Sequence, residues 1–430
     1  MPLDFGSRFL RGELLMKTPL IPGPDSHVLR RQTLQKLETV YRDINRAALV
    51  NSHPVNLEVA IESLKGVCER SIHTVSAAEH DTALLVACTD AVNSLRSILI
   101  PMLGMIVRAS NLRLAFELYY PLRRMTWALF GEKTALLLAS NWNYYPDTHV
   151  GHTFPLVIIG LPAIDSSNAL IVPLAGHEFG HNLWDDQGLS SEFDSRVNEA
   201  LRQVCQRDEA GGLLTEMLGK SHLEANGQPR WDSLEVKSFV STLTSVVSAQ
   251  LEEHFCDALA LRLFAESYLK ALCYLCVPGP QGRDDRYPPL TDRLRHLQQF
   301  AREIRVDWCV SELACTIGIE RSTVRGRLVR LLVDTLAPAV QRCARRLATD
   351  RRMPLRNRNR VDQISRQFRN LVPVGGKQTL TDIINAAWQV SDDLETARSL
   401  KLEPERWREL VNQMALKTCE VTEYHERLDS

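Results

Sequence analysis

Pro173-Leu-Ala-Gly-His-Glu-Phe-Gly-His-Asn-Leu-Trp184 contains the pattern H-E-x-x-H, and the rest of the chain is organised around it. The pattern falls on His177, Glu178 and His181. Positions i and i+4 of a helix lie on one face, so the two imidazole rings can converge on one metal ion. Glu178 lies beside them and can accept a proton from a water molecule at that metal. The stretch therefore predicts a helix that carries two metal ligands and a general base.

A third metal ligand is expected further along the chain, because a catalytic zinc site usually has three protein ligands and one open position. The downstream pattern H-x-x-G-x-x-H does not supply it, since Trp184 and Gln187 stand at its Gly and His positions. The other common solution is a Glu on a later helix. Glu253 is our candidate, and Asp257 lies four residues on, hence on the same helical face. Asp257 can accept the outward N–H of a ligating His and so orient that ring.

Glu252 is the rival third ligand, because it directly precedes Glu253. Its own i+4 neighbour is Cys256, a poor acceptor for an imidazole N–H. We therefore favour Glu253 as the ligand and Asp257 as the residue that orients a ligating His.

The segments His177–His181 and Glu253–Asp257 resemble the gluzincin zinc peptidases. A third segment, Tyr287-Pro-Pro-Leu-Thr-Asp-Arg293-Leu, resembles the His-Pro-Pro…Arg segment of the CAAX prenyl protease and heat-shock membrane protease group. The three pieces occur in that group's order and cover residues 170–297. The resemblance implies a zincin-like metallopeptidase with Zn²⁺ as its cofactor. It also implies that His177, His181 and Glu253 hold the metal.

Tyr287 stands where the group has a His that is taken to stabilise the oxyanion of the reaction. A Tyr hydroxyl donates the same kind of hydrogen bond, so the resemblance implies that Tyr287 fills this role. The alternative is that Tyr287 only packs against the helix that contains Arg293 and that another donor, such as His254, serves the oxyanion.

Composition predicts a soluble, cytoplasmic protein, and the resemblance implies a protein or peptide as its substrate. The charges nearly cancel, with 51 basic and 52 acidic residues, so no nucleic-acid partner is expected. Members of the family group span membranes, but here the longest apolar run, 98–107, is too short to cross a bilayer. The N-terminus has no continuous apolar segment of the kind a signal peptide needs. Ten cysteines without a framework spacing are typical of reduced cytosolic thiols.

The predicted fold is mainly α with a small β-sheet (α+β), that is, a zincin-like metallopeptidase core flanked by helical regions. Apolar residues at helical spacing fill both flanks. We expect four parts: an N-terminal tail (1–26), an N-terminal helical region (27–132), the metallopeptidase core (133–300) and a C-terminal helical region (301–430).

Short strands are expected just before the H-E-x-x-H helix. Runs rich in aliphatic and β-branched residues at 135–139 and 155–161 have strand length, and 142–145 adds aromatic residues. His149 and His152 lack a partner at helical spacing, so we expect loop residues there and not ligands. The edge of such a sheet can pair with an extended peptide.

The span between the H-E-x-x-H helix and Glu253 is expected to form helices that break at 211–212 and at 226–229. Its length suggests a helical lid or a wall of the substrate cleft.

The main competing signal lies at 310–328, which resembles a helix-turn-helix. Ser322, Thr323 and Arg325 would face DNA in that arrangement. Nine arginines follow between 345 and 369. Because the chain has no net basic charge, we favour a chance pattern followed by a solvated, loop-borne arginine patch.

The sequence therefore predicts a zinc-dependent metalloendopeptidase in which Glu178 and Tyr287 act on the substrate. One rival is a DNA-associated regulator that uses the 310–328 segment. The other is a catalytically inactive scaffold that keeps zinc for structure, although the intact Glu178 argues against it.

Overall fold

The computed structural model divides the chain into two compact units. Unit 1 comprises residues 1–51 and 61–105, and unit 2 comprises 52–60 and 106–430. Both boundaries expected at 133 and 300 lie within unit 2, and they remain predictions. The described residues are scattered positions between 30 and 48, followed by 57–78, 80–99, 102–103, 116–141, 147–150, 155–162, 168–205, 208–226, 228–276, 287–309 and 323–428.

The predicted fold class, mainly helical with a small β-sheet, is confirmed. No helix among the described residues is both long and apolar enough to cross a membrane. The described residues of unit 2 also form α8 (Asp208–Leu218), η4 (Lys220–His222), α13 (Arg358–Arg369), α15 (Leu394–Ser399) and α16 (Pro404–Leu428).

Unit 1 is built from amphipathic helices. The helix α2 (Leu57–Ala77) and the helix α3 (Asp81–Ser94) each bury one face, and α3 runs on into a π-helical turn, η1 (Leu95–Leu99). The thiol of Cys68 in α2 donates to the carbonyl of Leu37 at 3.3 Å, which ties α2 to an earlier helical segment. Apolar spacing of 3 and 4 residues explains these helices, as the sequence predicted.

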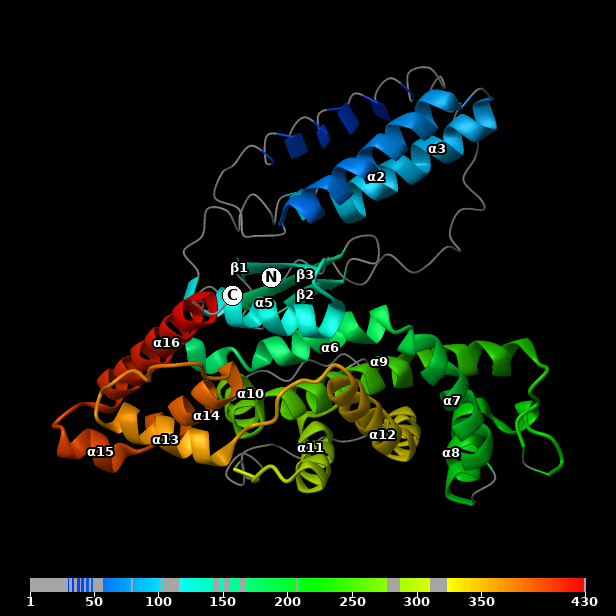
Figure 1. Cartoon of the computed structure of the whole chain (residues 1–430). Helices are drawn as coiled ribbons and strands as arrows, with labels where there is room; N and C mark the ends of the chain where they lie inside the picture. The colour runs from blue at the N-terminus through cyan, green and yellow to red at the C-terminus, as the bar shows by residue number, and fades with distance from the viewer. Residues whose placement is uncertain are drawn as a thin grey trace. The chain divides into compact units, whose positions relative to one another are not determined.

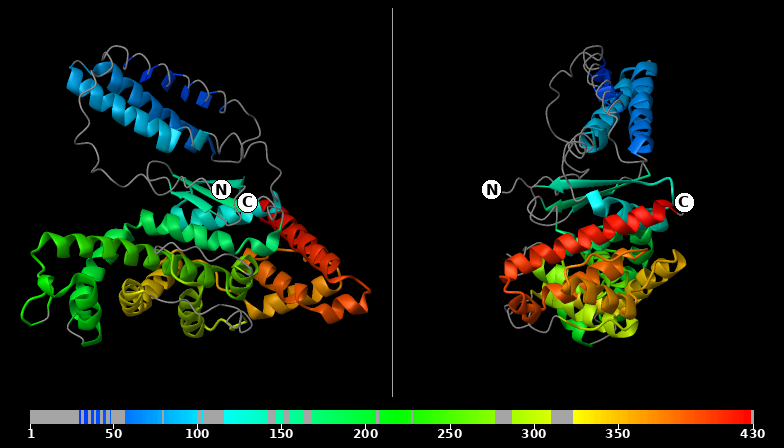
Figure 2. Two further views of the ribbon diagram at one scale, coloured as in Figure 1. Left: turned by 180° about the vertical axis from the view of Figure 1, so that it is seen from behind. Right: turned by 60° about the vertical axis from the view of Figure 1, so that its left-hand side comes forward.

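A three-stranded sheet opens the part of unit 2 that carries the H-E-x-x-H helix. Its order is β1-β3-β2, with β1 (Ala135–Asn141) parallel to β3 (Leu156–Pro162) and β2 (Asp147–Val150) antiparallel to it. The two predicted strands, 135–139 and 155–161, are confirmed as β1 and β3. The sheet packs on α5 (Phe116–Phe130) and α6 (Leu174–Asp186), with β2 and β3 next to α6 (Figures 1 and 2).

The helices α6 and α9 (Leu234–Phe264) pack side by side in the middle of unit 2 (Figure 1). The start of α6 follows a 3-10 turn, η3 (Ala169–Ile171), and its end is marked by Gly188, whose φ of 61° is left-handed. Ser233 caps α9 by accepting from the backbone N–H of Val236 at 3.2 Å. From Leu251 onward α9 is buried almost continuously, so it is the central helix of the core.

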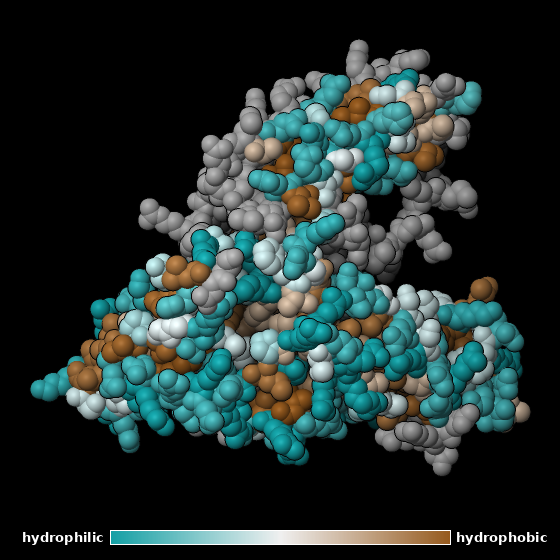
Figure 3. All heavy atoms as spheres, viewed as in Figure 1, coloured by the Kyte–Doolittle hydropathy of each residue, from teal (hydrophilic) through white to brown (hydrophobic). Residues whose placement is uncertain are grey.

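The remaining helices enclose α9. These are α7 (Leu189–Val204), α10 (Glu266–Cys276), α11 (Leu290–Ile304), α12 (Val324–Asp350) and α14 (Leu380–Ser391). On the face of unit 2 seen in Figure 3, hydrophilic residues predominate and hydrophobic residues form small separate groups.

Three local expectations need correction, and others lie outside the described residues. His149 lies in strand β2 and not in a loop, because its backbone pairs with Ile158 of β3. The expected break at 211–212 lies inside α8, since an adjacent pair of glycines weakens a helix without ending it. Most arginines of 345–369 lie in helices α12 and α13, so the patch is not loop-borne. The segments 142–146, 151–154 and 310–322 lie outside the described residues, as therefore does most of the helix-turn-helix candidate.

The contact between α6 and α9 depends on glycine. A Cβ built on Gly180 would lie 2.6 Å from Cα and 2.8 Å from Sγ of Cys256 in α9, closer than atoms can approach. One turn earlier, a Cβ on Gly176 would lie 3.1 Å from Cα of Ala260. Both glycines lower intrinsic helix propensity, but they let the two backbones pack directly.

We expect Gly180→Ala to destabilise the protein by about 1–3 kcal/mol, because the added methyl group forces α6 away from the backbone of α9. Urea unfolding with matched m-values measures this change. Gly212→Ala is the control: no atom lies within 4 Å of that Cβ, and alanine favours the helix, so its stability should stay equal or rise. Equal stability of Gly180→Ala and the wild type would contradict the close contact.

Candidate functional site

His177 and His181 project from one face of α6 toward α9, as their spacing predicted. Their ring centroids lie 5.0 Å apart with an interplanar angle of 79°. Their side chains are 12% and 20% exposed, so the pair is sheltered but reachable from solvent.

The Nδ1 atom of each ring contacts a carboxylate of α9. His177 Nδ1 lies 3.0 Å from Oδ1 of Asp257, and His181 Nδ1 lies 2.7 Å from Oε1 of Glu252. An ionised carboxylate can only accept, so in both rings Nδ1 carries a proton and donates it. The free Nε2 of each neutral ring is then a bare acceptor, which is the form that binds a metal.

Glu253 faces both of these Nε2 atoms. Its Oε2 lies 3.4 Å from Nε2 of His177, and its Oε1 lies 3.7 Å from Nε2 of His181. Acceptors that face acceptors at this range need a proton or a cation between them. Ligand atoms around tetrahedral zinc lie about 3.3–3.5 Å apart when the bonds are about 2.0–2.1 Å. The two distances, one to each oxygen of Glu253, are near that separation.

The pKa values of His177 and Glu253 show that a positive charge between them is favoured when no cation is bound. Burial lowers the pKa of His177, but hydrogen bonds with Asp257 and Glu253 and their negative charges outweigh it and raise the pKa to about 10. Burial raises the pKa of Glu253, but the hydrogen bond and charge of His177, together with Arg293 and His181, lower it to about 2. Positive charge between His177 and Glu253 is therefore strongly favoured.

Asp257 is held in place by a dense set of donors. Arg293 donates from Nε to Oδ2 at 2.8 Å and from Nη2 to Oδ1 at 2.6 Å, and the hydroxyl of Tyr268 in α10 donates to Oδ1 at 2.5 Å. Burial alone would raise the pKa of Asp257, but the charge and hydrogen bonds of Arg293 hold it well below its usual range. Asp257 thus stays ionised and fixes the orientation of the His177 ring.

Cys256 adds a sulfur atom to the group. Its Sγ and one ring nitrogen of each of His177 and His181 all lie within 4.8 Å of one another, so a metal ion could be bound among them. Burial, followed by the charges of Glu252 and Glu253, raises the pKa of the Cys256 thiol well above its usual value. Cys256 is fully buried against Gly180.

The other candidate residues are placed less directly. Glu178 is buried, and its charge acts on His181, which places it near the pair. Tyr287 is 57% exposed and lies three residues before Leu290, the first residue of α11, the helix that carries Arg293. His254 is 2% exposed, and burial followed by the charge of His296 lowers its pKa to about 3. A neutral ring at this depth is poorly placed to reach a substrate, which disfavours His254 as the oxyanion donor.

Glu252 is the residue that sequence reasoning misjudged. It contacts the outward Nδ1 of His181, and so it has the orienting role that Asp257 has for His177. From helix spacing within α9, Glu252 was judged as a ligand only by its i+4 neighbour, Cys256. The available signal was that a second ligating His needs a second acceptor.

Comparisons of the chain with protein-family models, with curated proteins and with solved structures gave no match.

Removing the charge of either orienting carboxylate should weaken metal binding. We expect Asp257→Asn and Glu252→Gln each to lower the affinity for Zn²⁺ by about 10–100-fold, because the ring tautomer is no longer fixed. Competition with a chromophoric chelator measures the affinity. Glu235→Gln, an exposed change in the first turn of the same helix, should leave it unchanged. If only Asp257→Asn has an effect, the contact between Glu252 and His181 does not matter for binding.

Metal uptake should release protons and strengthen as the pH rises. The pKa of His177 is raised to about 10, so without metal the ring is protonated at neutral pH and a metal must displace that proton. Affinity for Zn²⁺ should therefore rise with pH, by up to about tenfold per unit and proton displaced, and level off near the raised pKa. Calorimetry in two buffers of different ionisation enthalpy measures the proton release. An affinity independent of pH between 6 and 9 would rule out the displaced proton.

Proposed function

We propose that the chain is a zinc-dependent metallopeptidase whose metal is held by His177, His181 and Glu253. The observation that carries this proposal is the convergence of both Nε2 atoms on one carboxylate at 3.4 and 3.7 Å. Each ring is backed by a carboxylate at its Nδ1 atom, as catalytic metal sites commonly are. Zinc is the proposed ion because a donor set of two imidazoles and one carboxylate suits it.

Bound zinc would supply Lewis acidity, which polarises a peptide carbonyl and makes a water molecule more acidic. Two His and one Glu leave a fourth position for that chemistry. Asp257 and Glu252 keep the proton on Nδ1, so that the Nε2 lone pairs point inward.

Glu178 is the proposed general base. Its carboxylate accepts a proton from the attacking water and returns it to the leaving amine. Its place one residue after His177 and its burial keep it beside the ring pair. Tyr287 is the proposed donor to the oxyanion, a role that rests on the family resemblance and on its position just before α11.

A protein or peptide is the proposed substrate. Strand β2 lies at one edge of the described sheet and packs next to α6, so an extended peptide paired with that strand would run near the site.

The test compares Glu178→Gln with the wild type in metal content and in a broad peptide-cleavage screen. We expect Glu178→Gln to keep its zinc and to lose turnover by at least about 10²-fold, because it removes the proton acceptor and no ligand. Tyr287→Phe should also keep zinc and should slow turnover by about 10²–10³-fold. Glu235→Gln is the surface control.

Two results would count against this function. Full zinc occupancy in a His177→Ala, His181→Ala double variant would reject the metal assignment. Wild-type cleavage by Glu178→Gln would reject the general base.

A structural metal site is the second candidate, and the position of Cys256 favours it. If its thiolate binds together with both His and Glu253, four protein ligands close the site and no open position remains. Co²⁺ substitution separates the two functions, because a thiolate ligand gives a charge-transfer band in the near ultraviolet. A band that Cys256→Ser abolishes supports the structural site, and its absence from a metal-loaded protein supports the open one.

A further inference from the structure

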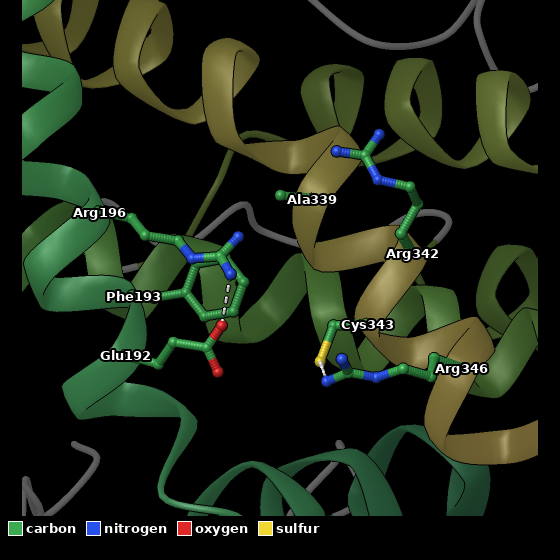
Figure 4. Close-up of a pocket in the computed structure, with 7 residues that line it drawn as sticks. All are labelled: Glu192, Phe193, Arg196, Ala339, Arg342, Cys343 and Arg346. Carbon is green, nitrogen blue, oxygen red and sulfur yellow. Dashed lines mark hydrogen bonds and ion pairs between the residues drawn. The ribbon is translucent and has the colours of Figure 1, made fainter. Parts of the chain in front are cut away.

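A cavity of about 180 Å³ lies between α7 and α12, and none of the candidate metal ligands lines it (Figure 4). Three arginines line it: Arg196 from α7, and Arg342 and Arg346 from α12. The lining contains one carboxylate, Glu192, which is already paired with Arg196 at 2.5 Å. The cavity wall therefore carries two positive charges more than negative ones.

The two α12 arginines have no carboxylate partner among the described residues. Arg346 donates only to Sγ of Cys343 at 3.8 Å, a weak contact. For Arg342 no hydrogen bond or ion pair to a described residue is found. The two are four residues apart, so their like charges share one helix face and repel each other. Both side chains are exposed, so an anion can approach them from solvent.

The walls of the cavity present these groups from both sides. Arg196 lies over the ring of Phe193, with 5.1 Å between its guanidinium carbon and the ring centroid, and this contact and Glu192 hold it in place (Figure 4). Arg346 extends from α12 toward Cys343 (Figure 4). Arginines from two helices thus border one hollow, which Phe193 and Ala339 also line.

We propose that this cavity binds a phosphoryl group. Guanidinium groups bind oxyanions through paired, charge-assisted hydrogen bonds. A phosphoryl group carries about −1.5 to −2 charge at pH 7, which matches the excess of two arginines, whereas one carboxylate offsets only one of them. The cavity is smaller than the roughly 300–1,000 Å³ of typical small-molecule pockets, so it suits a phosphoryl group on a short stem.

A residue that lines the cavity also packs against α6. The ring of Phe193 stacks on Trp184 of α6, with 5.3 Å between centroids and 22° between planes. Trp184 in turn packs against Phe255 of α9 at 5.4 Å. An anion that holds Arg196 over Phe193 therefore stabilises the aromatic stack that joins α7, α6 and α9. Binding should be visible as a rise in thermal stability.

The test titrates the full-length protein with inorganic phosphate and, separately, with phosphoserine by calorimetry at constant ionic strength. We expect saturable binding at one site, which Arg342→Gln and Arg346→Gln each weaken by about tenfold or more, since each removes charge-assisted hydrogen bonds. Arg345→Gln is the matched control: this exposed arginine lies on the same helix and does not line the cavity. It should change the affinity by less than about twofold.

The two ligands distinguish the source of the phosphoryl group. Tighter binding of phosphoserine indicates a phosphorylated peptide, and equal binding indicates free phosphate. Each of these outcomes supports the site.

The proposal is overturned if neither ligand gives saturable binding, or if Arg345→Gln weakens binding as much as Arg342→Gln. The second result would show that the anion responds to the general positive charge of α12 and not to this cavity. Circular dichroism checks that each variant is folded, and a rise in wild-type melting temperature with phosphate, but not with chloride of equal ionic strength, is the measurement that needs no variant. This test does not depend on peptidase activity, so the two proposals can fail separately.

Discussion

The direct packing of α6 on α9 at Gly180 is the contact on which the candidate site depends. With no Cβ between them, the backbone of α6 rests on Cα and Sγ of Cys256. This distance brings a ring on α6 within hydrogen-bond range of carboxylates on α9. A helix pair held at the usual 8–10 Å by larger side chains would separate these groups. The glycines weaken α6 as an isolated helix and stabilise the pair of helices.

The second constraint is electrostatic. Glu252, Glu253 and Asp257 stand within six residues of one helix, and Arg293 is the positive side chain that contacts two of them, Asp257 at 2.6 Å and Glu253 at 3.7 Å. Glu253 and Asp257 are buried and Glu252 is partly buried, and carboxylates this close together need compensating charge. A proton on His177 supplies part of it, and a divalent cation would supply more. The negative excess of this cluster is itself an argument for a metal.

The arginine-lined cavity between α7 and α12 shows the opposite imbalance. There the positive charges exceed the negative ones, and Glu192 is already engaged by Arg196. Both charge imbalances occur in unit 2, and each lies where two helices that are far apart in the sequence meet. The aromatic contacts among Phe193, Trp184 and Phe255 run between the two places.

The sequence by itself determined the parts that depend on local spacing. The period of 3.6 residues put His177 and His181 on one helix face, and apolar runs located β1, β3 and most helices. The same period placed Glu253 and Asp257 together on α9. The Gly pair of α8 and the strand at His149 were misjudged, because packing and strand pairing outweighed local propensity there.

Only the tertiary structure decided how the two helices of the site meet. The register of α9 against α6 assigned Asp257 to His177 and Glu252 to His181, and it set the thiol of Cys256 beside both rings. The arginine cavity likewise joins positions about 150 residues apart, which no local pattern relates. Spacing along one helix fixes which side chains share a face. The depth and register of the contact with another helix depend on the shapes of both surfaces, and at Gly180 on the absence of a single carbon atom.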